Sequence, residues 1–107
     1  MQTKYEVAES CLIIYVPREL DHHQAEILRA EVELLIHIHH AKNLVFDFEK
    51  TEFMDSSGIG VLIGRSRNLG FQNGVVYARN LGNRVKKIFQ ASGLERIIYV
   101  IPEESNV

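Results

Sequence analysis

The sequence of 107 residues contains a single cysteine, so no disulfide can form within the chain. That residue, Cys11, lies in the apolar run Cys11-Leu12-Ile13-Ile14-Tyr15-Val16, where we expect a buried and unreactive thiol. Long hydrophobic runs are also missing, because the longest hold about six residues, against the roughly 20 that cross a bilayer. The N-terminus shows no signal-peptide pattern. We therefore expect a soluble protein of the reducing cytoplasm, without membrane contact.

An excess of positive charge is absent as well. The chain has 12 Lys and Arg against 14 Asp and Glu, a formal net charge of -2, whereas a domain that binds nucleic acid usually carries a strongly basic face. A modest basic stretch lacks the interleaved aromatic residues that stack on bases, and it consists of Arg79, Arg84, Lys86 and Lys87. We interpret it as ordinary surface. The composition argues against direct nucleic-acid binding and favours a protein partner.

Metal and cofactor motifs are scarce. The triplet Asp21-His22-His23 resembles the motif of the DHH phosphoesterases, but such enzymes need several further aspartates, and this chain has only Asp47 and Asp55 besides. We read the triplet as a helix cap followed by two exposed histidines. A second group of histidines near an expected helix end is taken as solvated, namely His37, His39 and His40. A glycine-rich phosphate-binding loop with lysine is absent, so we predict no metal and no cofactor.

The pattern of strands and helices predicts one domain over residues 1–107, with 102–107 as a loose tail. Two apolar runs around Ala8-Glu9-Ser10 indicate a hairpin. Further strands are expected over 44–48, 75–78 and 97–101, and helices from Asp21, over 59–69 and from Asn83 to Ser92. This alternation predicts an α/β fold in which helices pack mainly on one face of a mixed sheet.

Helix signals are clear at the first helix. Asp21 is the expected N-cap, and Gln24 completes a capping box. One face of this helix is apolar and should cover the sheet, with Ala25, Leu28, Val32 and Leu35. The second helix should end at Gly70 and Asn73-Gly74. Both helices follow strands, so their starts are expected close together at one edge of the sheet.

Three glycines of the second helix call for an explanation, because an interior glycine costs about 1 kcal/mol relative to alanine. Gly60 and Gly64 are four residues apart and share a face, which favours close packing of this helix against a neighbour. Gly58 adjoins two hydroxyl groups. There, a missing side chain would let the active site of a partner approach the Ser56 backbone and Oγ.

The tetrapeptide Asp55-Ser56-Ser57-Gly58 is the most informative segment, because it places two hydroxyls where a helix is expected to begin. Aspartate and serine are common N-caps, so a structural role alone would explain an isolated motif of this kind. A phosphate on Ser56 would also suit the position, since it would lie at the positive end of the helix dipole and accept bonds from free N–H groups. It would add about 1.5 to 2 negative charges beside Asp55 and repel an apolar or acidic partner.

Three segments together strongly resemble the anti-sigma factor antagonists of spore-forming bacteria, which are STAS domains. They are Glu19-Leu20-Asp21-His22-His23, Phe53-Met54-Asp55-Ser56-Ser57-Gly58-Ile59-Gly60 and Phe89-Gln90-Ala91-Ser92-Gly93-Leu94. The resemblance implies a STAS-like fold and a sporulation antagonist of the sigma-F type. It implies that the unphosphorylated chain binds an anti-sigma factor that is also a serine kinase, that this kinase phosphorylates Ser56, and that a PP2C-type phosphatase reverses the reaction.

The resemblance also assigns a partner-binding surface on a monomer with no catalytic residues, made of Asp21, His22, His23, Asp55, Ser57, Gly58 and Ile59. Arg18 departs from the family, which usually has glycine there. The alternative within the same fold is a general-stress antagonist, whose loop tends to carry threonine at the position of Ser57. From another class, the alternative is a small hydrolase with Ser56 as nucleophile, although the chain lacks a G-x-S-x-G elbow.

Overall fold

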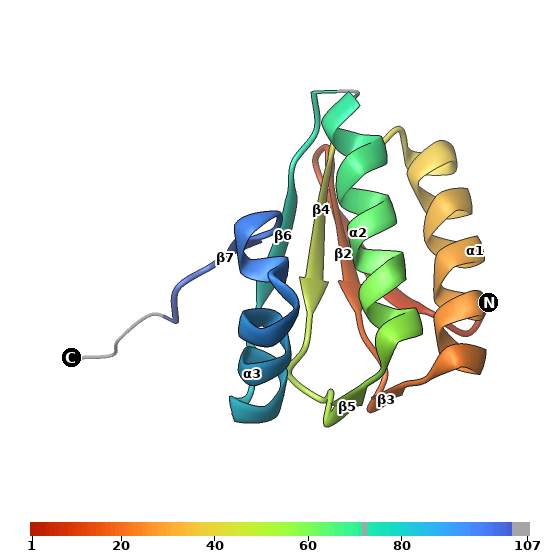
Figure 1. Ribbon diagram of the computed structural model, residues 1–107. Coiled ribbons are helices and arrows are strands. Elements are labelled where there is room, and N and C mark those ends of the chain that lie inside the picture. The colour runs from red at the N-terminus through yellow and green to blue at the C-terminus, as the bar shows by residue number, and fades with distance from the viewer. Residues whose placement is uncertain (72, 104–107) are drawn as a thin grey trace.

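A central sheet covered by helices on one face forms the body of the protein in the computed structural model, which describes residues 1–71 and 73–103 (Figure 1). The main sheet has five strands, and a second sheet has two short ones. The strands are β1 Lys4–Ala8, β2 Cys11–Tyr15, β3 Glu19–Leu20, β4 Asn43–Asp47, β5 Phe53–Met54, β6 Val76–Arg79 and β7 Tyr99–Val100. The helices are α1 His22–His39, α2 Ser56–Phe71, α3 Asn83–Ser92 and the 3₁₀ turn η1 Leu94–Arg96.

The main sheet runs in the order β1-β2-β4-β6-β7. β1 and β2 are antiparallel and form the predicted hairpin, whose turn places Glu9 in the left-handed region at a φ of 57°. The pairs β2 with β4, β4 with β6 and β6 with β7 are parallel. The mixed sheet and α/β class predicted from the sequence are therefore confirmed. The carboxyl ends of β2 and β4 point to the edge near which α1 and α2 begin (Figure 1).

The core lies between the sheet and the helices. Alternate residues of β2 and β4 are fully buried on this side, including Leu12, Ile14 and Phe46. The predicted apolar face of α1 is confirmed, since all four of its members are buried. Edge-to-face contact between Phe48 and Phe89, with ring centroids 5.5 Å apart, joins α3 to the same core.

On the face of the sheet opposite the helices, the expectation of a buried Cys11 is wrong. Cys11 is only half-buried, because it belongs to the alternate set of β2 residues that point away from the helices. Burial still raises the pKa of its thiol, which keeps the sulfur in the unreactive protonated form at neutral pH. The expectation of an unreactive thiol thus rests on partial burial.

Several boundaries differ from those expected. α2 continues through Gly70 to Phe71, because the cost of one helical glycine, about 1 kcal/mol, does not by itself end a helix. The last strand is limited to Tyr99–Val100, since the N–H groups of Ile97 and Ile98 both donate to the Leu94 carbonyl of the preceding 3₁₀ turn. Pro102 and Glu103 follow without regular structure, and residues 104–107 of the expected tail lie outside the described residues. No helix within the described ranges is long and apolar enough to span a bilayer.

Asp47 closes the end of β4 with a buried hydrogen-bond network. Its carboxylate accepts from Arg79 Nε at 2.7 Å, from Asn80 Nδ2 at 3.0 Å and from the Glu49 N–H at 2.9 Å. The side chain of Asp47 is 2% exposed and that of Arg79 is 33% exposed. The hydrogen bond to Asp47 raises the pKa of the Arg79 guanidinium, which stays charged. This network joins β4 to the end of β6.

We predict that Asp47→Ala lowers the free energy of unfolding by about 3 kcal/mol, because it removes the buried carboxylate that accepts from Arg79, Asn80 and the Glu49 N–H. Asp47→Asn should lose only about 1 kcal/mol, since an amide oxygen still accepts a hydrogen bond. Urea unfolding monitored by circular dichroism measures both values. Glu49→Ala is the matched control, because this exposed residue contributes only its backbone N–H. A loss in Asp47→Ala no larger than in Glu49→Ala would contradict the role of the network.

Candidate phosphoacceptor site

The short pair β3 and β5 brings the starts of α1 and α2 together at one edge of the molecule (Figure 1). Leu20 pairs with Met54 in parallel register, and the Asp55 N–H donates to the Leu20 carbonyl at 3.2 Å. The Glu52 N–H donates to the Arg18 carbonyl at 2.8 Å, and the two side chains form an ion pair at the same distance. The proximity predicted for the two helix starts is confirmed.

Asp21 caps α1 as predicted. Its backbone is extended, and Oδ1 accepts from the Gln24 N–H at 2.9 Å. Only this half of the predicted capping box forms among the described residues, because the Gln24 side chain makes no hydrogen bond to Asp21. This cap leaves His22 and His23 in the first turn of the helix, and both are exposed.

Asp55 caps α2 in the same way. Its Oδ1 accepts from the Ser57 N–H at 2.8 Å and from the Gly58 N–H at 3.3 Å. The Asp55 carbonyl accepts from the Ile59 N–H at 3.1 Å. The expectation that a phosphate would find free N–H groups in the first turn is therefore wrong for Ser57 and Gly58, because the Asp55 carboxylate already accepts from both.

Two neighbouring serines face different surroundings at this cap. Ser56 is exposed, and its Oγ has no hydrogen-bond partner among the described residues. Ser57 is half-buried, and its Oγ lies 3.0 Å from His22 Nδ1, a contact between residues 35 positions apart in the sequence. The structure thus gathers Asp21, His22, Asp55, Ser56 and Ser57 into one small surface.

Gly58 does not face a partner. It is buried, and a Cβ built on it would lie 2.7 Å from Met54 Cγ and 2.8 Å from Leu20 Cδ2. The expectation that Gly58 opens access to Ser56 is wrong, because the missing side chain makes room for the β3–β5 pair beneath α2. Ile59 is half-buried and packs against the core.

Gly60 and Gly64, which also belong to α2, differ from expectation as well. A Cβ on Gly60 or Gly64 would meet nothing within 4 Å, so these residues do not allow a close helix contact within the chain. They lie four and eight residues after Ser56, on the same side of the helix. The surface beyond Ser56 is therefore free of large side chains at these two positions.

Phe53 is a surface residue that the sequence did not single out. Its side chain lies on β5, two positions before Asp55, and the residue is 50% exposed. An exposed aromatic residue beside a functional loop is a common contact in protein interfaces. The sequence gives no clear signal for this exposure. Phe53 is exposed and Met54 is buried, but a strand of two residues is too short to show an alternating pattern.

The geometry gives little support to a hydrolase with Ser56 as nucleophile. A serine nucleophile is usually hydrogen-bonded to a base that a third group orients. Among the described residues, Ser56 Oγ contacts no histidine, and the only histidine contact in this loop is made by Ser57. No group of three or more His, Cys, Asp or Glu side chains in the described ranges could hold a metal ion.

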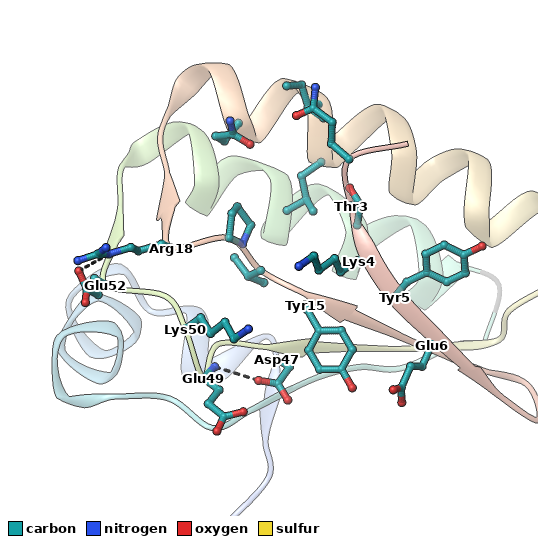
Figure 2. A pocket seen from close by; sticks show the side chains of 16 residues that line it. Thr3, Lys4, Tyr5, Glu6, Tyr15, Arg18, Asp47, Glu49, Lys50 and Glu52 are labelled. Atoms are coloured by element: carbon teal, nitrogen blue, oxygen red, sulfur yellow. Dashed lines mark hydrogen bonds and ion pairs between the residues drawn. The ribbon is translucent and has the colours of Figure 1, made fainter.

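A large hollow of about 1070 Å³ lies away from the serine loop. Figure 2 shows Tyr15, Lys4 and Lys50 around it, with Asp47 and Glu49 at one side. Its lining charges are mixed, and Ser56 and Ser57 do not line it. The candidate site is therefore an exposed helix start and not a cavity.

Comparison with known proteins assigns the chain to a family, since residues 2–107 match the family profile described as STAS domain. The chain belongs to the STAS family. This STAS domain is 35% identical to an anti-sigma F factor antagonist of Lysinibacillus sphaericus, over 82% of the chain and 75% of the relative. It is 28% identical to an anti-sigma F factor antagonist of Paenibacillus polymyxa, over 99% of the chain and 91% of the relative.

Solved structures agree with this assignment. The STAS domain matches the anti-sigma factor antagonist SpoIIAA in its unphosphorylated form with a TM-score of 0.75 and 29% identity, covering 95% of the chain and 89% of the relative. It matches the Bacillus cell fate determinant SpoIIAA in its phosphorylated form with a TM-score of 0.74 and 33% identity, covering 94% and 92%. The fold predicted from the resemblance is confirmed.

The two glycines at opposite sides of α2 give a matched test of packing. Gly58→Ala should lower the free energy of unfolding by about 1 to 3 kcal/mol, because the new methyl group overlaps Leu20 and Met54. Gly60→Ala should raise it by up to about 1 kcal/mol, since the position is helical and open. Urea unfolding of both variants measures the difference. Equal effects of the two substitutions would contradict the packing assigned to Gly58.

Proposed function

We propose that this STAS domain is an anti-sigma factor antagonist whose binding is controlled by phosphorylation of Ser56. The observation that carries the proposal is the exposed Ser56 hydroxyl at the first position of α2, beside the start of α1. The relatives at 35% and 28% identity are named as anti-sigma F factor antagonists. A solved relative exists in a phosphorylated form, which supports a covalent switch in this chain.

In the proposed cycle, the unphosphorylated chain binds an anti-sigma factor serine kinase in the cytoplasm and releases a sigma factor. The partner surface is formed by Asp21, His22 and His23 from α1, and by Asp55, Ser57 and Ile59 from α2, while Gly58 contributes through packing. The exposed aromatic ring of Phe53 and the surface free of large side chains at Gly60 and Gly64 extend this face. A PP2C-type phosphatase returns the phosphorylated chain to its binding form.

The phosphate would act through charge and would leave the fold intact. It would add about 1.5 to 2 negative charges next to the Asp55 carboxylate on an exposed surface. The helix dipole of α2 favours negative charge at this end, while Asp55 continues to cap the Ser57 and Gly58 N–H groups. The domain therefore remains folded, and the altered surface repels a partner that fitted the neutral serine.

The choice of sigma-F over the general-stress system rests on the relatives. An anti-sigma-B factor antagonist of Bacillus subtilis is 28% identical over 84% of the chain and 81% of the relative. The anti-sigma F relatives match either at a higher identity, 35%, or at the same 28% over a larger share of the chain, 99%. The chain also carries Ser57, where the general-stress type tends to have threonine. We propose the sporulation type accordingly.

The test is incubation of the protein with ATP and the anti-sigma factor kinase of the same cell, followed by intact-mass measurement and fragmentation. We expect one phosphate, located on Ser56 and absent from Ser56→Ala. Ser57→Ala is the matched control and should still accept phosphate on Ser56. Failure of an active kinase to modify the protein, or a phosphate on another residue, would contradict the proposed switch.

A further inference from the structure

Two adjacent serines begin α2, yet their hydroxyls are held very differently. Ser56 is exposed, and its side chain makes no hydrogen bond to any described residue. Ser57 is half-buried, its N–H is bonded to Asp55 Oδ1 at 2.8 Å, and its Oγ lies 3.0 Å from His22 Nδ1. A kinase that reaches this loop thus meets one free hydroxyl and one that is already engaged.

We propose that His22 is a positioning residue that determines which serine accepts the phosphate. It holds the Ser57 hydroxyl against the start of α1 and leaves Ser56 as the acceptor. The inference rests on the proposed function, because it concerns the regulation of the same loop. On this inference, the choice between the two serines is determined partly by the phosphorylated protein itself, through a residue 35 positions before Ser57 in the sequence.

The chemistry of transfer explains why this contact matters. The serine Oγ forms a bond to the γ-phosphorus of ATP while the bond from that phosphorus to the β,γ-bridging oxygen breaks, ADP leaves, and the hydroxyl proton passes to a base of the kinase. The attacking oxygen must approach in line, at about 3 to 3.5 Å. Ser57 Oγ would first have to leave His22 and turn outward, whereas Ser56 Oγ needs no such change.

A histidine beside a serine can instead activate it as a nucleophile, and the surroundings of His22 argue against that role. Activation usually needs a third group that orients the imidazole. Within the described part of the chain, no side chain or carbonyl is hydrogen-bonded to the other ring nitrogen of His22. The contact therefore fixes Ser57 in place. The two roles predict opposite effects when His22 is removed.

The test uses Ser56→Ala as the background, so that any phosphate must go to another residue. With the kinase and ATP, Ser56→Ala alone should accept almost none. The double variant Ser56→Ala/His22→Ala should gain phosphate on Ser57, with an initial rate at least tenfold higher. Ser56→Ala/His37→Ala is the matched control, because His37 is an exposed histidine of the same helix that lies outside the proposed partner surface and is absent from the Ser57 contact, and it should stay unmodified.

A conservative replacement and a kinase-free measurement complete the test. Ser56→Ala/His22→Asn should reverse the gain, since the side-chain amide can reach the position of Nδ1. In the wild type, Hα–Hβ couplings from NMR should show a single Ser57 χ1 rotamer, and in His22→Ala they should show averaging. Unchanged melting temperatures would establish that all variants remain folded.

The outcomes separate this inference from the proposed function. Phosphate on Ser56 of both the wild type and His22→Ala, with none on Ser57 of Ser56→Ala/His22→Ala, would overturn the role of His22 and leave the proposed function standing, because the kinase would still reach the loop without this histidine. Phosphate on Ser57 in Ser56→Ala that disappears when His22 is replaced would also overturn it, because His22 would then be an activator. A wild type that accepts no phosphate from an active kinase would contradict both.

Discussion

The pairing of β3 with β5 is the constraint on which the functional surface depends. These strands have two residues each, but they join the chain before α1 to the chain before α2. Leu20 and Met54 lie side by side beneath α2, and Gly58 leaves the space that they occupy. The two caps, Asp21 and Asp55, then hold the helix starts at the same edge, where His22 reaches Ser57. Without this pairing, the histidines at the start of α1 and the serines at the start of α2 would lie apart.

The same arrangement explains how a surface can change its charge while the fold persists. The core lies between the sheet and the helices, away from Ser56, and the α2 cap is supplied by Asp55. A phosphate on Ser56 would therefore alter a part of the molecule that contributes little to stability. Its effect falls on whatever partner covers the exposed start of α2, which is the physical requirement for a reversible binding switch.

Much of the fold could be predicted from the sequence because its signals are local. The Asp21 cap, the buried face of α1 and the hairpin at Glu9 each depend on residues within a few positions of one another. The family resemblance added the prediction that Ser56 accepts a phosphate. The roles of the glycines in α2 were not predicted correctly, because a local sequence does not show what packs against a glycine. Gly58 lies against Leu20 and Met54, which belong to other elements, while Gly60 and Gly64 face open space.

The remaining features depend on contacts between distant segments. Strands as short as β3 and β5 show no alternation, so no periodic pattern reveals them. The contact between His22 and Ser57 spans 35 positions and exists only because of that pairing. α2 continues past Gly70, which shows that the low helix propensity of one glycine does not by itself end a helix.

If the proposed switch operates, a phosphate on Ser56 changes the affinity for the anti-sigma factor and not the fold. Isothermal titration calorimetry of the anti-sigma factor with the unphosphorylated and the Ser56-phosphorylated protein tests it most directly. We expect the Kd to rise at least tenfold after phosphorylation, a loss of about 1.4 kcal/mol in binding free energy, with an unchanged circular dichroism spectrum. Equal affinities of the two forms, or a loss of binding that accompanies unfolding, would contradict it.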